Sequence, residues 1–228
     1  MNLNILALVA AIVLLSSEWP MTSALAQTPP SVSEIAAYDG LHAAAHQNDT
    51  AAIETALAMG AEIESRDNSG RTPLLVAAHA SAYDAVRSLV QGGADIRAMD
   101  HQRYDVVTIA AVKNDVKMVT LALQLGGDPE AITSPFDGTA LIAAAHLGHA
   151  DVVETLIEAN APLDHINNLD WTALIEAVVL GDGGRARIET VRLLVEAGAN
   201  KSIADRDGRT PLEHAKARGY EEIVAILK

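Results

Sequence analysis

The chain repeats one pattern of about 33 residues six times, and this repetition restricts its fold more than any other feature. Each copy opens on a leucine-like residue that precedes small apolar residues, most often an alanine pair. The openings are Leu41, Leu74, Val107, Leu141, Leu174 and Leu212, spaced 33, 33, 34, 33 and 38 residues apart. A second aliphatic block follows each opening, as in VRSLVQGGADI from Val86. Such a period indicates an array of stacked units.

The second copy, from Asp67 to Asp100, predicts how one unit folds. Thr72 can cap a helix, and Pro73 suits its first position, where the missing N–H costs nothing. A second helix should present Val86 and its aliphatic neighbours to the core. Gly93 should end that helix, because the left-handed residue after a helix is usually Gly or, failing that, Asn. The equivalents of Gly93 are Gly60, Gly126, Asn160 and Gly198.

Composition excludes several classes of protein. The 228 residues contain no cysteine, which excludes disulfide scaffolds, Cys-ligated zinc, iron–sulfur clusters and thiol nucleophiles. The formal net charge of −14 argues against nucleic-acid binding, which needs a basic surface. Forty-two alanines and only 3% aromatic residues predict small core side chains and closely packed helices.

The N-terminal segment is predicted to be a signal peptide, residues 1–26. Ile5 to Leu15 contain no polar side chain, and this run is too short to span a bilayer. Ala24 and Ala26 stand at −3 and −1 of a cleavage site before Gln27. The alternative is an uncleaved membrane anchor, since no Lys or Arg precedes the apolar run. Cleavage would make the protein periplasmic or secreted, with no membrane contact afterwards.

Beyond the cleavage site, the sequence divides into a leader and the repeats. Residues 27–37 are polar at first, contain Pro29 and Pro30, and are expected to form a flexible leader. Residues 38–228 are expected to form the repeat domain. Its copies span approximately 38–67, 68–100, 101–133, 134–167, 168–205 and 206–228.

The repeat resembles the ankyrin repeat family. The resemblance rests on motifs such as Gly70-Arg71-Thr72-Pro73-Leu74 and Gly208-Arg209-Thr210-Pro211-Leu212, and covers roughly residues 38 to 228. The third copy departs most, because Tyr104-Asp105-Val106-Val107 replaces Gly-x-Thr-Pro-Leu. The first copy lacks Thr-Pro and looks like a shortened cap. The resemblance implies an all-α, right-handed ankyrin-repeat solenoid of about 5.5 repeats, which binds a protein partner.

The resemblance also implies where a partner binds. In similar families, contacts come from the residue before Thr, from the turn, and from the two positions after the alanine pair. Carried over to this sequence, together with the insertion described below, these positions give ten candidates. They are Arg71, His79, His101, Tyr104, Lys113, Phe136, His146, Trp171, Arg185 and Arg209.

Three aromatic residues single out copies three to five. Tyr104, Phe136 and Trp171 fall on the predicted turns of consecutive copies, and exposed aromatic residues are common interface anchors. We expect a binding stripe centred on Trp171. The alternative is that these rings pack sideways on neighbouring turns and stiffen the array.

The last spacing, 38 residues, contains an insertion of about five residues within Leu180–Arg187. It lies between the two helices of the fifth copy and carries Arg185 and Arg187 in an otherwise acidic protein. Insertions in repeat arrays map to surface loops, often on the binding face. The insertion is therefore either a partner contact or a tolerated surface loop.

Catalysis and metal binding have little support in the sequence. His42 and His46 are four residues apart on one helix, but His42 occupies a position where the family's histidine bonds neighbouring backbone. His149 matches the family's Gly-His at the start of the second helix. No serine lies in a Gly-x-Ser-x-Gly elbow, and a single-layer array lacks a deep pocket. We expect no cofactor, no metal and no enzymatic activity.

The sequence therefore predicts a non-enzymatic, monomeric module that binds a protein in the periplasm. An acidic array favours a basic partner through electrostatic steering. Two alternatives stay open. One is an immunity-like inhibitor of a periplasmic effector or hydrolase. The other, from a different class, is a metal-dependent enzyme acting on an envelope component.

Overall fold

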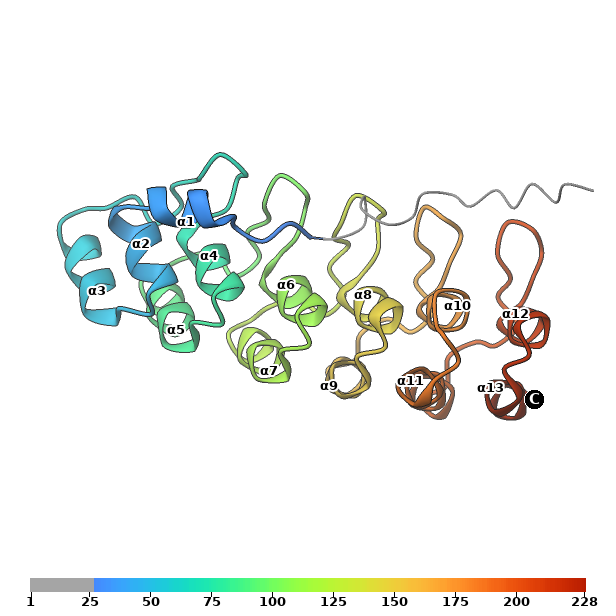
Figure 1. Cartoon of the computed structure of the whole chain (residues 1–228). Helices are drawn as coiled ribbons and strands as arrows, with labels where there is room; N and C mark the ends of the chain where they lie inside the picture. The colour runs from blue at the N-terminus through green and yellow to red at the C-terminus, as the bar shows by residue number, and fades with distance from the viewer. Residues whose placement is uncertain (1–26) are drawn as a thin grey trace, which may run out of the picture.

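Six antiparallel helix pairs, stacked side by side, make up the repeat domain in a computed structural model that describes residues 27–228. Figure 1 shows the first helix of each pair in one row, the second helices in a row below, and the connecting hairpins projecting above. The predicted all-α solenoid is confirmed. The predicted signal peptide, residues 1–26, lies outside the described residues. Within residues 27–228, no helix is long and apolar enough to cross a bilayer.

One short helix, α1 (Val32–Ala37), precedes the pairs. The first helices of copies one to six are α2 (Gly40–His46), α4 (Pro73–His79), α6 (Val106–Val112), α8 (Ala140–Leu147), α10 (Ala173–Val179) and α12 (Pro211–Arg218). The second helices are α3 (Thr50–Ala58), α5 (Tyr83–Gln91), α7 (Val116–Gln124), α9 (Ala150–Glu158), α11 (Arg185–Glu196) and α13 (Glu221–Leu227).

Local signals start and end these helices as the sequence predicts. The Thr72 hydroxyl accepts a hydrogen bond from the Leu75 N–H and caps α4. In the divergent third copy, Asp105 takes the place of threonine, and its carboxylate accepts from the Thr108 N–H at 2.8 Å. After the second helices, Gly93 and the single substitute Asn160 both adopt the left-handed conformation, with φ of 101° and 61°.

The core consists of the leucine and alanine columns. Leu74, Leu141 and the pairs Ala77-Ala78, Ala110-Ala111 and Ala144-Ala145 are all 0% exposed. Because alanine adds so little volume, first helices of consecutive copies pack directly against each other, α4 on α6 and α6 on α8. The far end is closed by α12 and α13, whose polar side chains face outward, while Ile223 and Leu227 are buried.

A polar side chain organises the hairpin in each of copies two to six. It accepts hydrogen bonds from the backbone N–H groups two and four residues later, as Asp67 does from Ser69 and Arg71, both at 2.9 Å. The equivalent residues are Asp100, Ser134, Asn167 and Asp205. These side chains give the hairpins one shared shape without any regular strand in the described residues, which contain a single isolated bridge.

Backbone hydrogen bonds connect several neighbouring hairpins. The His101 N–H donates to the Ser69 carbonyl at 3.0 Å, and the Ser134 N–H donates to the Arg103 carbonyl at 3.0 Å. The Asn168 N–H donates in the same way to the Phe136 carbonyl at 2.9 Å. The hairpins of copies two to five therefore form a continuous, ordered edge.

The leader, residues 27–37, is more ordered than the sequence prediction of a flexible segment. Its second half forms α1, which begins with a capping box: the Ser31 hydroxyl accepts from the Glu34 N–H, and the Glu34 carboxylate accepts from the Ser31 N–H. The prediction of a flexible segment is therefore wrong for this half, because the Ser-x-x-Glu signal of Ser31 and Glu34 starts a helix directly after the two prolines.

The insertion in the fifth copy is only partly a loop. Residues 180–184 form the loop, and the remainder extends α11 to 12 residues, against nine in the second helices of copies one to four. Arg187 turns back and donates to the Ala145 carbonyl at 2.7 Å and to the His146 carbonyl, at the end of α8. The Tyr220 hydroxyl donates to the Gly181 carbonyl at 2.8 Å. Both ends of the insertion thus pack against neighbouring copies.

We predict that Arg187→Met lowers the free energy of unfolding by about 1–2 kcal/mol, because it removes the charged donor from the last carbonyls of α8. Urea denaturation followed by circular dichroism measures this change. The matched control is Arg185→Met, since Arg185 is exposed two residues earlier on the same helix. Equal stability of the two variants would contradict the structural role of Arg187.

Candidate binding surface

The ten residues predicted to contact a partner differ widely in exposure. His101, Lys113, Arg185 and Arg209 are exposed, while Phe136, His146 and Trp171 are partly buried. Arg71, His79 and Tyr104 are buried, with 1%, 9% and 4% of their surface exposed. The surface that a partner can reach directly therefore lies mainly over copies three to six.

The predicted aromatic stripe is interrupted at its first member. Tyr104 belongs to the hydrophobic core, so the predicted exposure of this ring is wrong. The alternative, that the ring packs against neighbouring residues, describes Tyr104. Phe136 and Trp171 retain partial exposure, and their contact with a partner stays a prediction.

Copies four and five bring together a polar cluster that was not predicted from the sequence. His146, at the end of α8, places Nδ1 3.0 Å from Oε2 of Glu176 on α10. The other carboxylate oxygen of Glu176 accepts from the Asn167 amide at 3.0 Å. Glu176 is only 3% exposed, whereas the His146 side chain is 29% exposed. A buried carboxylate thus fixes the orientation of an imidazole that solvent can reach.

The signal for this cluster is visible when the copies are aligned. Glu176 occupies a column that holds Ala43, Val76, Ile109 and Ala143 in the first four copies. The sixth copy has His214 there, whose Nε2 lies 2.7 Å from Oδ2 of Asp205 on its own hairpin. In copies five and six, the side chain in this column therefore bonds the residue that organises its own hairpin: Glu176 bonds Asn167, and His214 bonds Asp205.

Cationic side chains bind the carboxyl ends of three first helices. Lys113 donates to the His79 carbonyl at the end of α4, and Arg187 binds the end of α8 as described above. Arg218 donates to the Val179 carbonyl at the end of α10, from Nη2 at 2.7 Å. Each cation offsets the negative end of a helix dipole. These charges are therefore partly engaged before any partner arrives.

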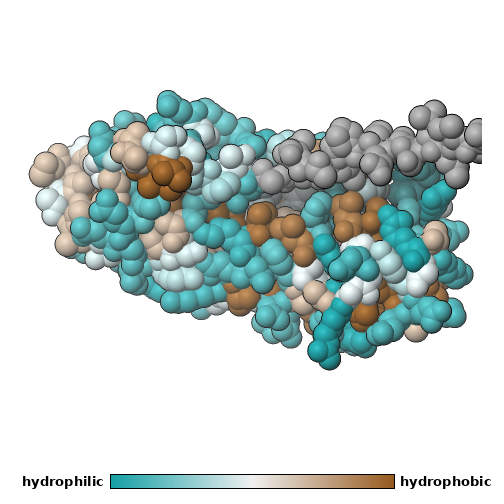
Figure 2. Space-filling model, viewed as in Figure 1, coloured by the Kyte–Doolittle hydropathy of each residue, from teal (hydrophilic) through white to brown (hydrophobic). Residues whose placement is uncertain are grey.

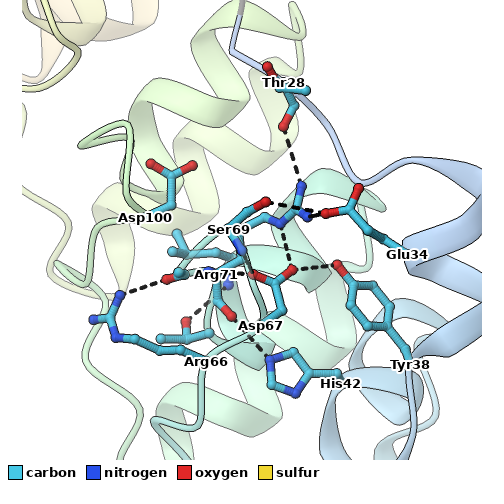
Figure 3. A network of polar contacts seen from close by, with 12 residues as sticks. Thr28, Glu34, Tyr38, His42, Arg66, Asp67, Ser69, Arg71 and Asp100 are labelled. Atoms are coloured by element: carbon cyan, nitrogen blue, oxygen red, sulfur yellow. Dashed lines mark hydrogen bonds and ion pairs between the residues drawn. The ribbon is translucent and has the colours of Figure 1, made fainter.

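Arg71 is the centre of a network at the hairpin of the second copy (Figure 3). Its Nε donates to Oδ2 of Asp67 at 2.7 Å, and its Nη2 forms an ion pair with Glu34 of α1. The Tyr38 hydroxyl donates to the same Asp67 oxygen at 2.8 Å. A small polar hollow of about 240 Å³ lies beside the network, lined by Glu34, Tyr38, Asp67 and others.

The network holds its carboxylates ionised. Hydrogen bonds from Ser31, followed by the charge of Arg71, lower the pKa of Glu34 to about 2. Burial alone would raise the pKa of Asp67, but hydrogen bonds from Arg71 and Tyr38 outweigh it and lower that pKa below its ordinary value. Arg71 therefore faces two negative charges at neutral pH.

His79 is buried without a hydrogen-bond partner. Within the described residues, neither of its ring nitrogens forms a hydrogen bond. Burial, and then the nearby charges of Arg71 and Lys113, lower the pKa of His79 to about 4. The ring is consequently neutral at pH 7.

Other histidines bond backbone. His42 Nε2 lies 3.1 Å from the Arg71 carbonyl oxygen, and His149 Nδ1 lies 2.9 Å from the Ala111 carbonyl oxygen. The first contact confirms the predicted backbone role of His42, and the second shows what the histidine of the Gly148-His149 pair bonds. Across residues 27–228, no group of three or more His, Asp or Glu side chains is arranged to hold a metal ion.

The accessible surface is polar with isolated apolar points. Figure 2 shows brown, hydrophobic atoms in separate patches among teal, hydrophilic ones on the face in view. The large exposed hydrophobic side chains include Val32, Ile132, Leu147 and Ile166. Leu147 is 39% exposed and directly follows His146, which gives the polar cluster an apolar neighbour.

Comparisons with known proteins agree with the fold. A family model described as ankyrin repeats (3 copies) matches residues 23–100 and 107–205. The ankyrin repeat protein YahD of Escherichia coli strain K12 is 42% identical over 93 residues, which are 40% of this chain and 46% of YahD. The chain thus matches less than half the length of this curated relative.

Solved structures match over most of the described residues. A crystal structure of an ankyrin repeat domain from Acinetobacter baumannii AYE has 42% sequence identity and a TM-score of 0.77, covering 82% of this chain and 95% of that one. A chain in the complex of the predatory endopeptidase Bd0816 of Bdellovibrio bacteriovorus with immunity protein Bd3460 has a TM-score of 0.70. It covers 83% of this chain and 97% of its own, and at 20% identity it shows the fold alone.

We predict that His79→Leu makes the unfolding free energy less dependent on pH. In the unfolded chain the imidazole binds a proton near pH 6.5, whereas in the folded chain it does so only near 4. Wild-type stability should therefore fall as the pH drops from about 6.5 to 4, by about 3 kcal/mol from this group. Urea denaturation at pH 7, 6, 5 and 4 measures the difference.

The control for this series is His101→Leu, because His101 is exposed. The His79→Leu profile should be flatter than the His101→Leu profile. A His79→Leu profile that runs parallel to the wild-type profile would show that the buried ring does not resist protonation.

Proposed function

This chain belongs to the ankyrin repeat family, and from that premise we propose that its array is a non-enzymatic module that binds a protein partner in the periplasm. The contact surface in this proposal consists of the hairpin tips and the exposed ends of the first helices over copies three to six. The predicted signal peptide supports the location. The observation that carries the proposal is the His146–Glu176 cluster, with Trp171 and Leu147 close to it in sequence.

The cluster supports binding because the fold does not require it. Most copies place an apolar residue in the column of Glu176, so a buried carboxylate there has no packing advantage. Its effect is to hold His146 in one orientation at the surface. A preorganised polar side chain next to an exposed apolar one is a common arrangement at protein interfaces.

The affinity test compares His146→Ala and Trp171→Ala with the parent chain. Tyr104→Ala is unsuitable, because removing a buried ring would leave a cavity and destabilise the array. Each protein is immobilised and exposed to periplasmic extract, and the captured protein is then titrated. We expect at least tenfold weaker binding for each variant.

The matched control is Glu154→Ala, an exposed position on the outer helix α9. It should bind the captured protein as the parent does. Equal affinity of the parent, His146→Ala and Trp171→Ala would contradict the proposed surface.

The negative net charge of the chain supports a basic partner. The predicted mature chain would lose only one charged residue with the signal peptide, Glu18, so its formal net charge would change from −14 to −13. Opposite charges accelerate encounter at low ionic strength. Raising NaCl from 50 to 500 mM should therefore lower the association rate constant about tenfold or more in surface plasmon resonance. A rate constant independent of salt would contradict steering.

An immunity-like inhibitor is the second candidate. The observation that favours it is the shared fold with a chain of the endopeptidase–immunity protein complex. The two functions differ in their effect on the captured partner. An inhibitor should abolish a hydrolytic activity of that partner at a one-to-one ratio, whereas a scaffold should leave its activity intact.

A further inference from the structure

The leader, residues 27–37, lies across the hairpins of copies two and three. In Figure 1 the blue segment that precedes α1 runs across the loop that leads to α6. Thr28 in this segment also contacts Arg71 of the second copy's hairpin. Contacts between the leader and these hairpins join residues up to 74 positions apart in the sequence. The leader therefore occupies part of the surface where the family resemblance places partner contacts.

The first half of the leader is bound through its backbone. The Thr28 N–H donates to the side-chain oxygen of Gln102 at 3.2 Å, and the Thr28 carbonyl accepts from Nη1 of Arg71 at 3.4 Å. Pro29 and Pro30 favour an extended backbone after Thr28. Because these contacts involve main-chain atoms, an extended segment of another sequence could make them too.

The second half is bound through one carboxylate. Glu34 forms the ion pair with Nη2 of Arg71, and the Ser69 hydroxyl donates to Glu34 Oε1 at 3.2 Å (Figure 3). Arg71 stands immediately before the capping threonine of its copy, at one of the positions predicted for partner contact. With the leader in place, Arg71 is only 1% exposed.

The leader is attached by polar contacts and buries little apolar surface. No residue of α1 is buried, and Val32 is 85% exposed. A segment that served to cover the core would turn its aliphatic side chains inward. Glu34 stays 32% exposed in the ion pair. One partly solvated ion pair and a few hydrogen bonds oppose the entropy of ordering eleven residues, so this contact belongs to the parts of the molecule that open most easily.

We propose that the hairpins of copies two and three form a binding site for an extended peptide segment that carries a carboxylate, and that the leader fills this site until a segment of the partner displaces it. The proposal rests on the function proposed above, that the array binds a protein. Gln102 would accept from the segment's backbone N–H, and Arg71 and Ser69 would bind its carboxylate. This local preference for an acid is compatible with a partner that is basic overall.

The test uses residues 27–228 and a labelled peptide with the sequence of residues 27–37. Glu34→Arg in the protein should expel the leader, because two cations would then face each other. Fluorescence polarisation should show the peptide binding to the Glu34→Arg protein at least tenfold more tightly than to the wild type. In the wild type, the tethered leader competes at an effective concentration in the millimolar range.

Three controls make the result specific. Glu54→Arg changes the net charge equally but lies on the exposed side of α3, and should behave as the wild type. A peptide with Gln in place of its glutamate should bind the Glu34→Arg protein at least tenfold less tightly. Gln102→Ala in the Glu34→Arg background should also weaken binding, while circular dichroism shows an unchanged fold.

Hydrogen exchange, together with peptide binding, distinguishes failure of this proposal from failure of the function proposed above. The Thr28 amide should exchange at least tenfold faster in Glu34→Arg than in the wild type. If its protection is unchanged, or if neither protein binds the peptide, the leader is a fixed part of the fold and the proposal is wrong. If the peptide binds as expected but no protein is captured from the extract, the site stands and the function proposed above is wrong.

Discussion

Contact between consecutive copies is the constraint on which the whole structure depends. A single helix pair cannot bury its own leucine and alanine columns, so each inner copy needs a neighbour on both sides and each terminal copy needs one. The alanine pairs let the first helices pack directly against each other, and the last carbonyls of each helix lack partners within that helix. Side chains from the next copy, or from the insertion, bind these ends, as Lys113 and Arg187 do. Packing and polar contacts therefore connect the same neighbours.

This arrangement separates the residues that build the array from those that can vary. The leucine, alanine and capping threonine columns are fixed by packing and by helix geometry. The residue before each capping residue is not fixed in this way, and it is Arg71, Tyr104 or Trp171 in different copies. Two of these three are buried here by contacts peculiar to their copy. A position that is free to vary is therefore not always free to bind.

Most of the fold could be predicted from the sequence, because its signals are local and repeated six times. The caps, the left-handed Asn160 and the backbone role of His42 all follow from motifs within one copy. The predicted exposure of Tyr104 and the predicted flexibility of the leader were wrong. The contacts of Arg187 were not predicted at all, because they depend on the neighbouring copy. The His146–Glu176 pair joins residues 30 positions apart, and only a column-by-column comparison of the copies reveals it.

The described chain is held at its C-terminal end by apolar burial and at its N-terminal end by polar contacts, and the two ends should therefore differ in how easily they detach. At the C-terminal end, α13 buries Ile223 and Leu227, so removing it would expose core and unfold the last copy. At the N-terminal end, α1 buries no residue and is held through Glu34 to Arg71. Detaching it would expose polar groups that water can solvate. The leader can therefore leave the hairpins without cost to the core, and a competing carboxylate needs only to match one ion pair and its few hydrogen bonds.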